Sequence, residues 1–277
     1  MVRAISKDFL KDLKSGALNP LLEMVHVDDT LDLELRGESV NIYYRGGSLF
    51  KITAKGAHSY DIFFDIRYCS TAAWSATGRI VVSNPSITQA VQNIPFYKQA
   101  MDMWFSKHPR YEKEAQQRIV LENNNQGSIS NGTDCFIIDT EYAFANYRFD
   151  MIGLKWLSDG TIRKGSRDTS LAIIELKYGD GALGGTAGIR KHLTDIDSFI
   201  RSGAVPAFKT DMEDVFEQKR QLGLVNALLH NKNHVVVQEK LPDAMFIFAN
   251  HDPASTTLFS ILRTINPAAY GFTIWIA

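Results

Sequence analysis

The chain contains little cysteine, no long apolar run and no excess of charge of either sign. Its two cysteines, Cys69 and Cys135, are too few for a disulfide framework or a four-cysteine zinc site. We therefore expect free thiols buried in strands, in a reducing compartment. No apolar segment approaches the ~20 residues that cross a bilayer, and the charged, amphipathic N-terminus has no secretory signal. The sequence predicts a soluble, cytoplasmic protein with no membrane partner.

The balance of charge argues against global attraction to polyanions. The sequence has 30 Lys and Arg residues against 31 Asp and Glu residues, a formal net charge of −1. Any surface that binds nucleic acid therefore has to be a local basic patch. The chain also lacks His-Glu-x-x-His, Gly-x-Ser-x-Gly and Cys-x-x-Cys motifs. These absences disfavour zinc proteases, serine hydrolases and thiol redox enzymes.

The N-terminal part of the chain is predicted to be rich in β-structure. An amphipathic helix over residues 5–16 ends at Gly16, and β-type segments follow at 31–36, 39–45, 48–54 and 60–69. Gly46-Gly47 predicts a hairpin between the second and third of these strands. The segments carry an aromatic and basic mixture that could contact a nucleic acid backbone or simply cover the wet face of a sheet: Tyr43, Tyr44, Arg45, Lys51 and Lys55.

Helical patterns and further strands follow. One helical segment starts near Asn84 and contains Pro95, which is expected to kink or divide it, and another starts near Pro109. Thr186 is expected to cap a helix over 187–201, and Thr210 with Glu213 fits a capping box that opens a long helix. The remaining elements are expected strands at 234–238, 244–250 and 272–277, with a helix over 256–265.

The segment from Asp134 to His192 carries the chemistry. It contains three short apolar runs rich in Ile, Phe and Leu and bounded by turn residues, the pattern of strands in a covered sheet. An ionised group in such a strand costs several kcal/mol, on the order of the buried-charge penalty, unless something pairs with it. The runs nevertheless include five charged residues, which indicates a function: Asp139, Glu141, Asp150, Glu175 and Lys177.

Alternation along the strands brings some of these charges together. Glu175 and Lys177 are two residues apart and share a face. An antiparallel return of the third strand on the second would bring Asp150 beside Glu175. Mg²⁺ prefers oxygen ligands and keeps several waters, so two carboxylates and a main-chain carbonyl, such as that of Leu176, suffice to bind Mg²⁺ or Mn²⁺. The metal would activate a water, and Lys177 would stabilise the charge of the transition state.

The order helix, strand, strand with Asp150, strand with Glu175-x-Lys177, helix resembles the PD-(D/E)XK nuclease superfamily, the fold of many restriction endonucleases. The likeness covers about residues 109–201, and the three strand sequences are similar to those of an uncharacterised bacterial branch of that superfamily. The resemblance implies that Asp150 binds the metal and that Glu175 and Lys177 form the Glu-x-Lys pair. It also implies magnesium-dependent hydrolysis of DNA, or of RNA, and a homodimer if both strands are cut.

The resemblance also carries a fold and a domain division. It implies an α/β protein with a restriction-endonuclease-like mixed central sheet flanked by helices. We expect this core over residues 106–277, with an accessory N-terminal β-rich extension over residues 1–105.

Two further acidic residues are candidate metal ligands. Some members of the superfamily add a glutamate from the preceding helix, and Glu122 fits because it is expected to share an inward face with Tyr111, Ala115 and Ile119. The alternative for Glu122 is a charge at a helix end. Glu141 is either an extra ligand or a partner of Arg190 or Lys191.

Candidate phosphate contacts lie in two places. One is the connection between the second and third strands, where a solvated charge run is the alternative: Arg163, Lys164 and Arg167. The other is the start of the following helix, with Arg190 and Lys191 after the glycine-rich segment 179–188. Glycines before a helix can place N–H groups around a phosphate or can simply form a flexible connection. His192 is expected to be a partly buried helix residue, not a general base.

Three functions remain open from the sequence. The first is a magnesium-dependent nuclease. The second is an inactive module of the same fold that binds nucleic acid or a partner protein. The third is a nucleotide-handling enzyme that uses segment 179–188, although this segment lacks the Gly-Lys-Ser/Thr ending of a nucleotide-binding loop.

Overall fold

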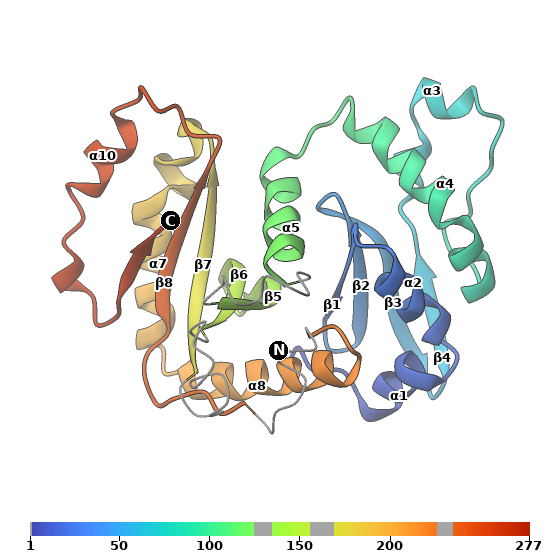
Figure 1. Ribbon diagram of the computed structural model, residues 1–277, viewed down its shortest axis with the longest axis horizontal. Coiled ribbons are helices and arrows are strands. Elements are labelled where there is room, and N and C mark those ends of the chain that lie inside the picture. Colours follow the sequence, from blue (N-terminus) through green and yellow to red (C-terminus); the bar gives the residue numbers. More distant parts are fainter. Residues whose placement is uncertain (1, 125–134, 156–168, 226–234) are drawn as a thin grey trace. The chain divides into compact units, whose positions relative to one another are not determined.

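A computed structural model describes residues 2–124, 135–155, 169–225 and 235–277. The chain is a mixed α/β protein with a four-stranded antiparallel sheet and a five-stranded mixed sheet, which confirms the expected α/β class (Figure 1). Its contacts define two compact units. The N-terminal unit comprises residues 2–121 and 218–225, and the C-terminal unit comprises the described parts of 122–217 and 226–277. The sequence predicts a boundary between the two domains after residue 105, whereas the contacts divide the chain after residue 121.

The N-terminal unit contains a β-meander after two short helices. Its strands pair in the order β1-β2-β3-β4, all antiparallel. The predicted hairpin is confirmed: Tyr44 pairs with Gly47, and the turn residues Arg45 and Gly46 have φ of 50° and 70°, a conformation that suits glycine. The bounds are α1 Lys7–Ser15, α2 Asn19–Val27, β1 Leu31–Leu35, β2 Ser39–Tyr44, β3 Gly47–Gly56 and β4 Ser59–Phe63.

Two longer helices follow the meander. The expected fourth strand ends at Phe63, because Asp65 accepts a hydrogen bond from the Arg67 N–H and starts a 3₁₀ turn. Pro95 does not divide the first helix, which is continuous and starts at a capping box formed by Ser86 and Gln89. The bounds are η1 Ile66–Cys69, α3 Ala72–Ser75, α4 Ile87–Phe105 and α5 Tyr111–Asn124.

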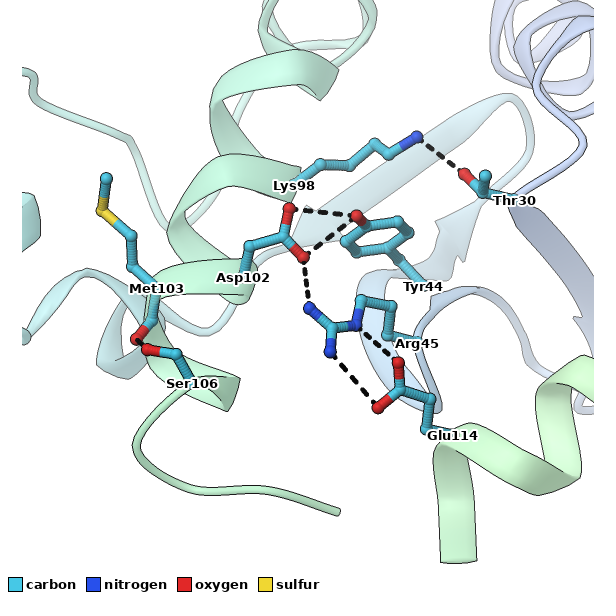
Figure 2. A network of polar contacts seen from close by, with 8 residues as sticks. All are labelled: Thr30, Tyr44, Arg45, Lys98, Asp102, Met103, Ser106 and Glu114. Carbon is cyan, nitrogen blue, oxygen red and sulfur yellow. Dashed lines mark hydrogen bonds and ion pairs between the residues drawn. The ribbon is translucent and has the colours of Figure 1, made fainter. Parts of the chain in front are cut away.

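A polar network joins the β2–β3 hairpin to α4 and α5 (Figure 2). Arg45 donates to Asp102 of α4 at 2.7 Å and to Glu114 of α5 at 2.8 Å. The Tyr44 hydroxyl donates to Asp102 at 3.0 Å, and burial together with the Asp102 charge raises the pKa of Tyr44 to about 12. Lys98 of α4 donates to Thr30 at 2.7 Å. The polar groups of Tyr44 and Arg45 thus hold the unit together, which favours the structural interpretation of these two residues.

The C-terminal unit is built around the second sheet. Its strand order is β5-β6-β7-β8-β9, with antiparallel pairing from β5 to β7 and parallel pairing from β7 to β9. Helix α7 lies along the β7–β8 part of this sheet (Figure 1). The strands are β5 Cys135–Phe144, β6 Tyr147–Lys155, β7 Ser170–Tyr178, β8 Asp243–Ala249 and β9 Ile274–Ile276. The helices are η3 Asp180–Ala182, η4 Gly185–Ala187, α7 Ile189–Arg201, α8 Val205–Gln221, α10 Thr257–Leu262 and η5 Pro267–Ala269.

Several local expectations for this unit are wrong. Thr186 lies inside the η4 turn and does not cap α7, which starts after Gly188 without a side-chain cap. Helix α8 starts at Val205, so Thr210 lies inside it and its hydroxyl bonds to the Pro206 carbonyl. Glu213 accepts instead from the Val237 N–H at 2.7 Å. In place of the expected strand at 234–238, the described residues form one isolated bridge, between Thr169 and Val237.

The cysteines and the helices bear on two further expectations. Cys69 and Cys135 are free thiols as expected, but both are partly exposed, and whereas Cys135 lies in β5, Cys69 lies in the η1 turn and not in a strand. Burial raises the pKa of the Cys69 thiol to about 11, which makes it a poor nucleophile at neutral pH. Within the described ranges, none of the helices is both long enough and apolar enough to span a membrane.

The polar network predicts a specific loss of stability. Arg45→Met should lower the free energy of unfolding by about 1–2 kcal/mol, because it leaves the half-buried Asp102 and Glu114 carboxylates without their shared cation. The measurement is urea denaturation followed by circular dichroism. Arg67→Met is the matched control, since Arg67 is exposed and pairs with Asp65, two residues away in sequence. Equal effects of the two variants would contradict a stabilising role for the network.

Candidate active site

The candidate site lies where the pairing of β6 with β7 ends. Ile152 pairs with Ile173, and the register ends with the next pair, Met151 and Ile174. Asp150 and Glu175 come immediately after that last pair, on the face that Ile152 and Ile173 share. The expected antiparallel return of the third strand on the second is therefore present.

The side chain of Asp150 bridges the two strands beyond this point. Its Oδ2 accepts a hydrogen bond from the backbone N–H of Leu176 at 3.0 Å. Because Leu176 directly follows Glu175, this bond ties the first carboxylate to the strand that carries the second. The two carboxylates lie close enough that the charge of Asp150 contributes to raising the pKa of Glu175.

Glu175 is fully buried, and two basic side chains approach one of its oxygens. Lys177 Nζ lies 3.5 Å from Oε2. His192 Nδ1, from α7, lies 2.7 Å from the same oxygen, off the line of an ideal hydrogen bond. The other oxygen, Oε1, is buried and has no hydrogen-bond partner among the described residues. Lys177 is itself only 4% exposed, so the pair lies inside the protein.

The pKa of Glu175 lies above its ordinary value, and burial is the largest cause. Burial and the charge of Asp150 raise this pKa, whereas the contact with His192 and the charge of Lys177 lower it. The net direction is upward, so the neighbouring basic groups do not fully offset the loss of hydration. A cation placed beside these carboxylates would be stabilised for the same reason.

The donor set fits a magnesium ion held by few protein ligands. Within the part of the chain that the structure describes, no group of three or more His, Cys, Asp or Glu residues could hold a metal ion. Mg²⁺ does not need such a cage, because it commonly binds through one or two carboxylates and keeps several waters. Asp150 and Glu175 supply two such carboxylates. The Oε1 of Glu175 is buried without a hydrogen-bond partner among the described residues.

Glu122 does not lie where the sequence suggested. It is exposed near the end of α5, and Tyr111, its expected companion on an inward face, is also exposed, by 59%. The expected inward face is therefore wrong. The reason lies in Asn124, whose side-chain amide accepts from the Ile137 N–H at 3.0 Å and donates to the Ile137 carbonyl at 2.8 Å. This pairing with β5 sets the rotation of the helix end.

Glu141 is exposed and has a left-handed backbone, with φ of 52°. It lies between the β5–β6 pairs Thr140↔Met151 and Tyr142↔Phe149, so it is opposite Asp150 in register. This position keeps it as a candidate extra ligand beside the site. Asp139, the other acid of β5, is fully buried, and its Oδ1 accepts from the Thr140 N–H at 2.9 Å.

The structure describes two of the five basic residues that are expected to contact phosphate. Arg163, Lys164 and Arg167 lie outside the described residues. Arg190 and Lys191 are exposed in the first turn of α7, where Arg190 donates to Thr264 and Lys191 pairs with Asp195. Gly179 and Gly185 in the preceding segment both have φ of 73°, so backbone conformation alone accounts for glycine at these two positions.

The sequence did not identify the contact of His192 with Glu175. His192 is partly buried on α7, as expected, with a side chain that is 20% exposed. It directly precedes Leu193, one of the buried residues of the helix, and this position gives no hint of an acidic partner 17 residues earlier. Only the packing of α7 on the sheet brings the two side chains together.

The raised pKa of Glu175 predicts an unusual pH dependence of stability in metal-free protein. The folded state binds the proton more tightly than the unfolded state, so this contribution to stability is present below about pH 4.5 and is lost as the pH rises through the folded pKa. Glu175→Gln should therefore reduce the loss of stability with rising pH, by about 1.4 kcal/mol for each pKa unit of the shift.

The measurement is urea unfolding between pH 4.5 and 8 in the presence of EDTA. Glu122→Gln is the control, because it removes an exposed carboxylate from the same unit and should leave the profile unchanged. A Glu175→Gln profile parallel to that of the wild type would contradict the raised pKa.

Comparisons of this chain with family models, with curated proteins and with solved structures give no match. The function therefore has to be argued from the geometry of Asp150, Glu175, Lys177 and His192.

Proposed function

We propose that the protein is a magnesium-dependent nuclease that hydrolyses phosphodiester bonds of DNA. The observation that carries the proposal is the convergence of Asp150 and Glu175 at the end of the β6–β7 ladder, with Lys177 3.5 Å from Glu175 Oε2. The sequence motif required this convergence but could not demonstrate it. Structural ion pairs also bury carboxylates, but here the carboxylate retains a raised pKa beside its basic neighbours.

The topology supports the same proposal. Helix α5 precedes the antiparallel meander β5-β6-β7, helix α7 follows it, and β8 joins β7 in parallel. This is the order that the resemblance to the restriction-endonuclease-like core leads one to expect. The two acids and the lysine occupy its second and third strands.

Each residue has a distinct role in the proposed reaction. Asp150 and Glu175 would hold Mg²⁺ or Mn²⁺, and Lys177 would stabilise the negative charge that develops on the phosphate oxygens. When bound, the metal supplies a Lewis acid for the phosphate and acidifies a water. Arg190 and Lys191 are proposed phosphate contacts because they are exposed in the same turn of α7 as His192. Cutting both strands would call for a homodimer.

An inactive module of the same fold is the rival function. It is favoured by one observation: Glu175 already has two basic neighbours, as an acid in a purely structural cluster would have. Such a module would bind nucleic acid or a partner protein without hydrolysis.

Cleavage of plasmid DNA with Mg²⁺, and with EDTA as the metal-free control, separates the two functions. Lys177→Ala and Glu175→Ala should each lower the cleavage rate at least about 100-fold, because the first removes a cation that stabilises the transition state and the second removes a ligand of the metal. Lys209→Ala is the matched control, because Lys209 is another buried lysine of the same unit and donates to the Gln238 carbonyl.

Circular dichroism and thermal unfolding have to show that all three variants fold. An EDTA-resistant activity, or equal losses in Lys177→Ala and Lys209→Ala, would overturn the proposed site. Parallel assays on single-stranded and double-stranded DNA and on RNA define the substrate.

A further inference from the structure

His192 contributes a nitrogen to the candidate site from outside the motif. The three motif residues lie on β6 and β7, whereas His192 lies in the first turn of α7. Its Nδ1 is buried and lies 2.7 Å from Glu175 Oε2. The 20% of the side chain that is exposed therefore belongs to its other atoms. We propose that His192 is a positioning residue that holds the Glu175 carboxylate in its cation-binding orientation. This inference rests on the proposed function.

The packing of α7 makes this contact rigid. Ile189, Leu193, Ile196 and Phe199 of α7 are buried, and Phe199 packs edge-on against Phe149 of β6 with ring centroids 5.2 Å apart. His192 directly precedes Leu193 and lies one turn after Ile189, so these buried residues fix its backbone position relative to the sheet. A ring with two rotatable bonds then loses little entropy when it holds the carboxylate.

The contacts divide the two oxygens of Glu175 between separate roles. Both basic groups approach Oε2: Lys177 Nζ at 3.5 Å and His192 Nδ1 at 2.7 Å. Both oxygens are buried, and neither forms a hydrogen bond of good geometry with the described residues. Buried carboxylates that serve only a structural role normally have their oxygens satisfied by hydrogen bonds. At Glu175 the two basic nitrogens instead lie beside Oε2, so His192 orients the carboxylate from that side and leaves Oε1 for a ligand.

The arrangement follows a general rule for metal sites. A ligand carboxylate binds a cation best when a second residue fixes its orientation, and loss of such a residue typically costs about 10–100-fold in metal affinity. Lys177 alone is a weak orienter at 3.5 Å, because a flexible lysine does not define a direction as a ring nitrogen does.

Two substitutions separate this role from mere packing. His192→Leu fills similar space but removes the nitrogen, whereas His192→Asn can place its amide nitrogen near the position of Nδ1. Binding of Mn²⁺ without DNA, measured by electron paramagnetic resonance of the free ion, reports affinity independently of cleavage. We expect His192→Leu to weaken Mn²⁺ binding about 10–100-fold, and His192→Asn to recover most of that loss. The Mg²⁺ concentration for half-maximal cleavage should shift in parallel.

Controls and a second variant keep the test decisive. His26→Leu removes another partly buried histidine, whose Nε2 lies 2.9 Å from the Leu222 carbonyl oxygen, and should leave Mn²⁺ binding unchanged. If His192→Leu does not fold, His192→Gln takes its place, since its amide extends beyond the Nδ1 position and should weaken binding.

The outcomes distinguish this inference from the proposed function. Wild-type affinity in His192→Leu, or equal losses in the Leu and Asn variants at equal thermal stability, would overturn positioning by His192 while leaving a nuclease intact. A wild-type protein that neither binds Mn²⁺ nor cleaves DNA would overturn both.

Discussion

The bond between the Asp150 carboxylate and the Leu176 N–H is the contact on which the candidate site depends. It joins Asp150, one residue past the last β6–β7 pair, to Leu176, two residues past it on the other strand. One acid is thereby tied to the main chain of the strand that carries the other. This bond fixes the Asp150 carboxylate against β7, and such fixed placement is the preorganisation that a small cation site requires.

Two buried glutamates of this protein show the difference between a structural acid and a candidate functional one. Glu34 of β1 is fully buried and has ion pairs with two basic residues. Lys219 Nζ lies 2.9 Å from one of its oxygens, and the Arg36 guanidinium lies 3.6 Å from the other. Glu175 is equally buried, with Lys177 at 3.5 Å and His192 at 2.7 Å from its Oε2, and its pKa is nevertheless raised. Uncompensated burial of this kind costs stability, and proteins retain it where the charge is used.

Local patterns predicted the elements that depend on nearest neighbours in sequence. Turn chemistry and periodicity predicted the β2–β3 hairpin, the three strands around Asp150 and Glu175, and the helix that became α7. The predicted start of α8 was wrong because the side chain expected to cap it bonds to a residue distant in sequence. Glu213 bonds to Val237 and not to the helix end that the capping pattern implied.

The sequence by itself determined that Glu175 and Lys177 share a face and that an acid stands in the neighbouring strand, because alternation along a strand is a local property. Only the tertiary structure decided which other groups meet them. The Asn124 amide turned Glu122 outward by pairing with β5, and the packing of α7 brought His192 to Glu175. Both contacts depend on how a helix is rotated against a sheet, and that rotation is set by packing and hydrogen bonds between segments that are distant in sequence.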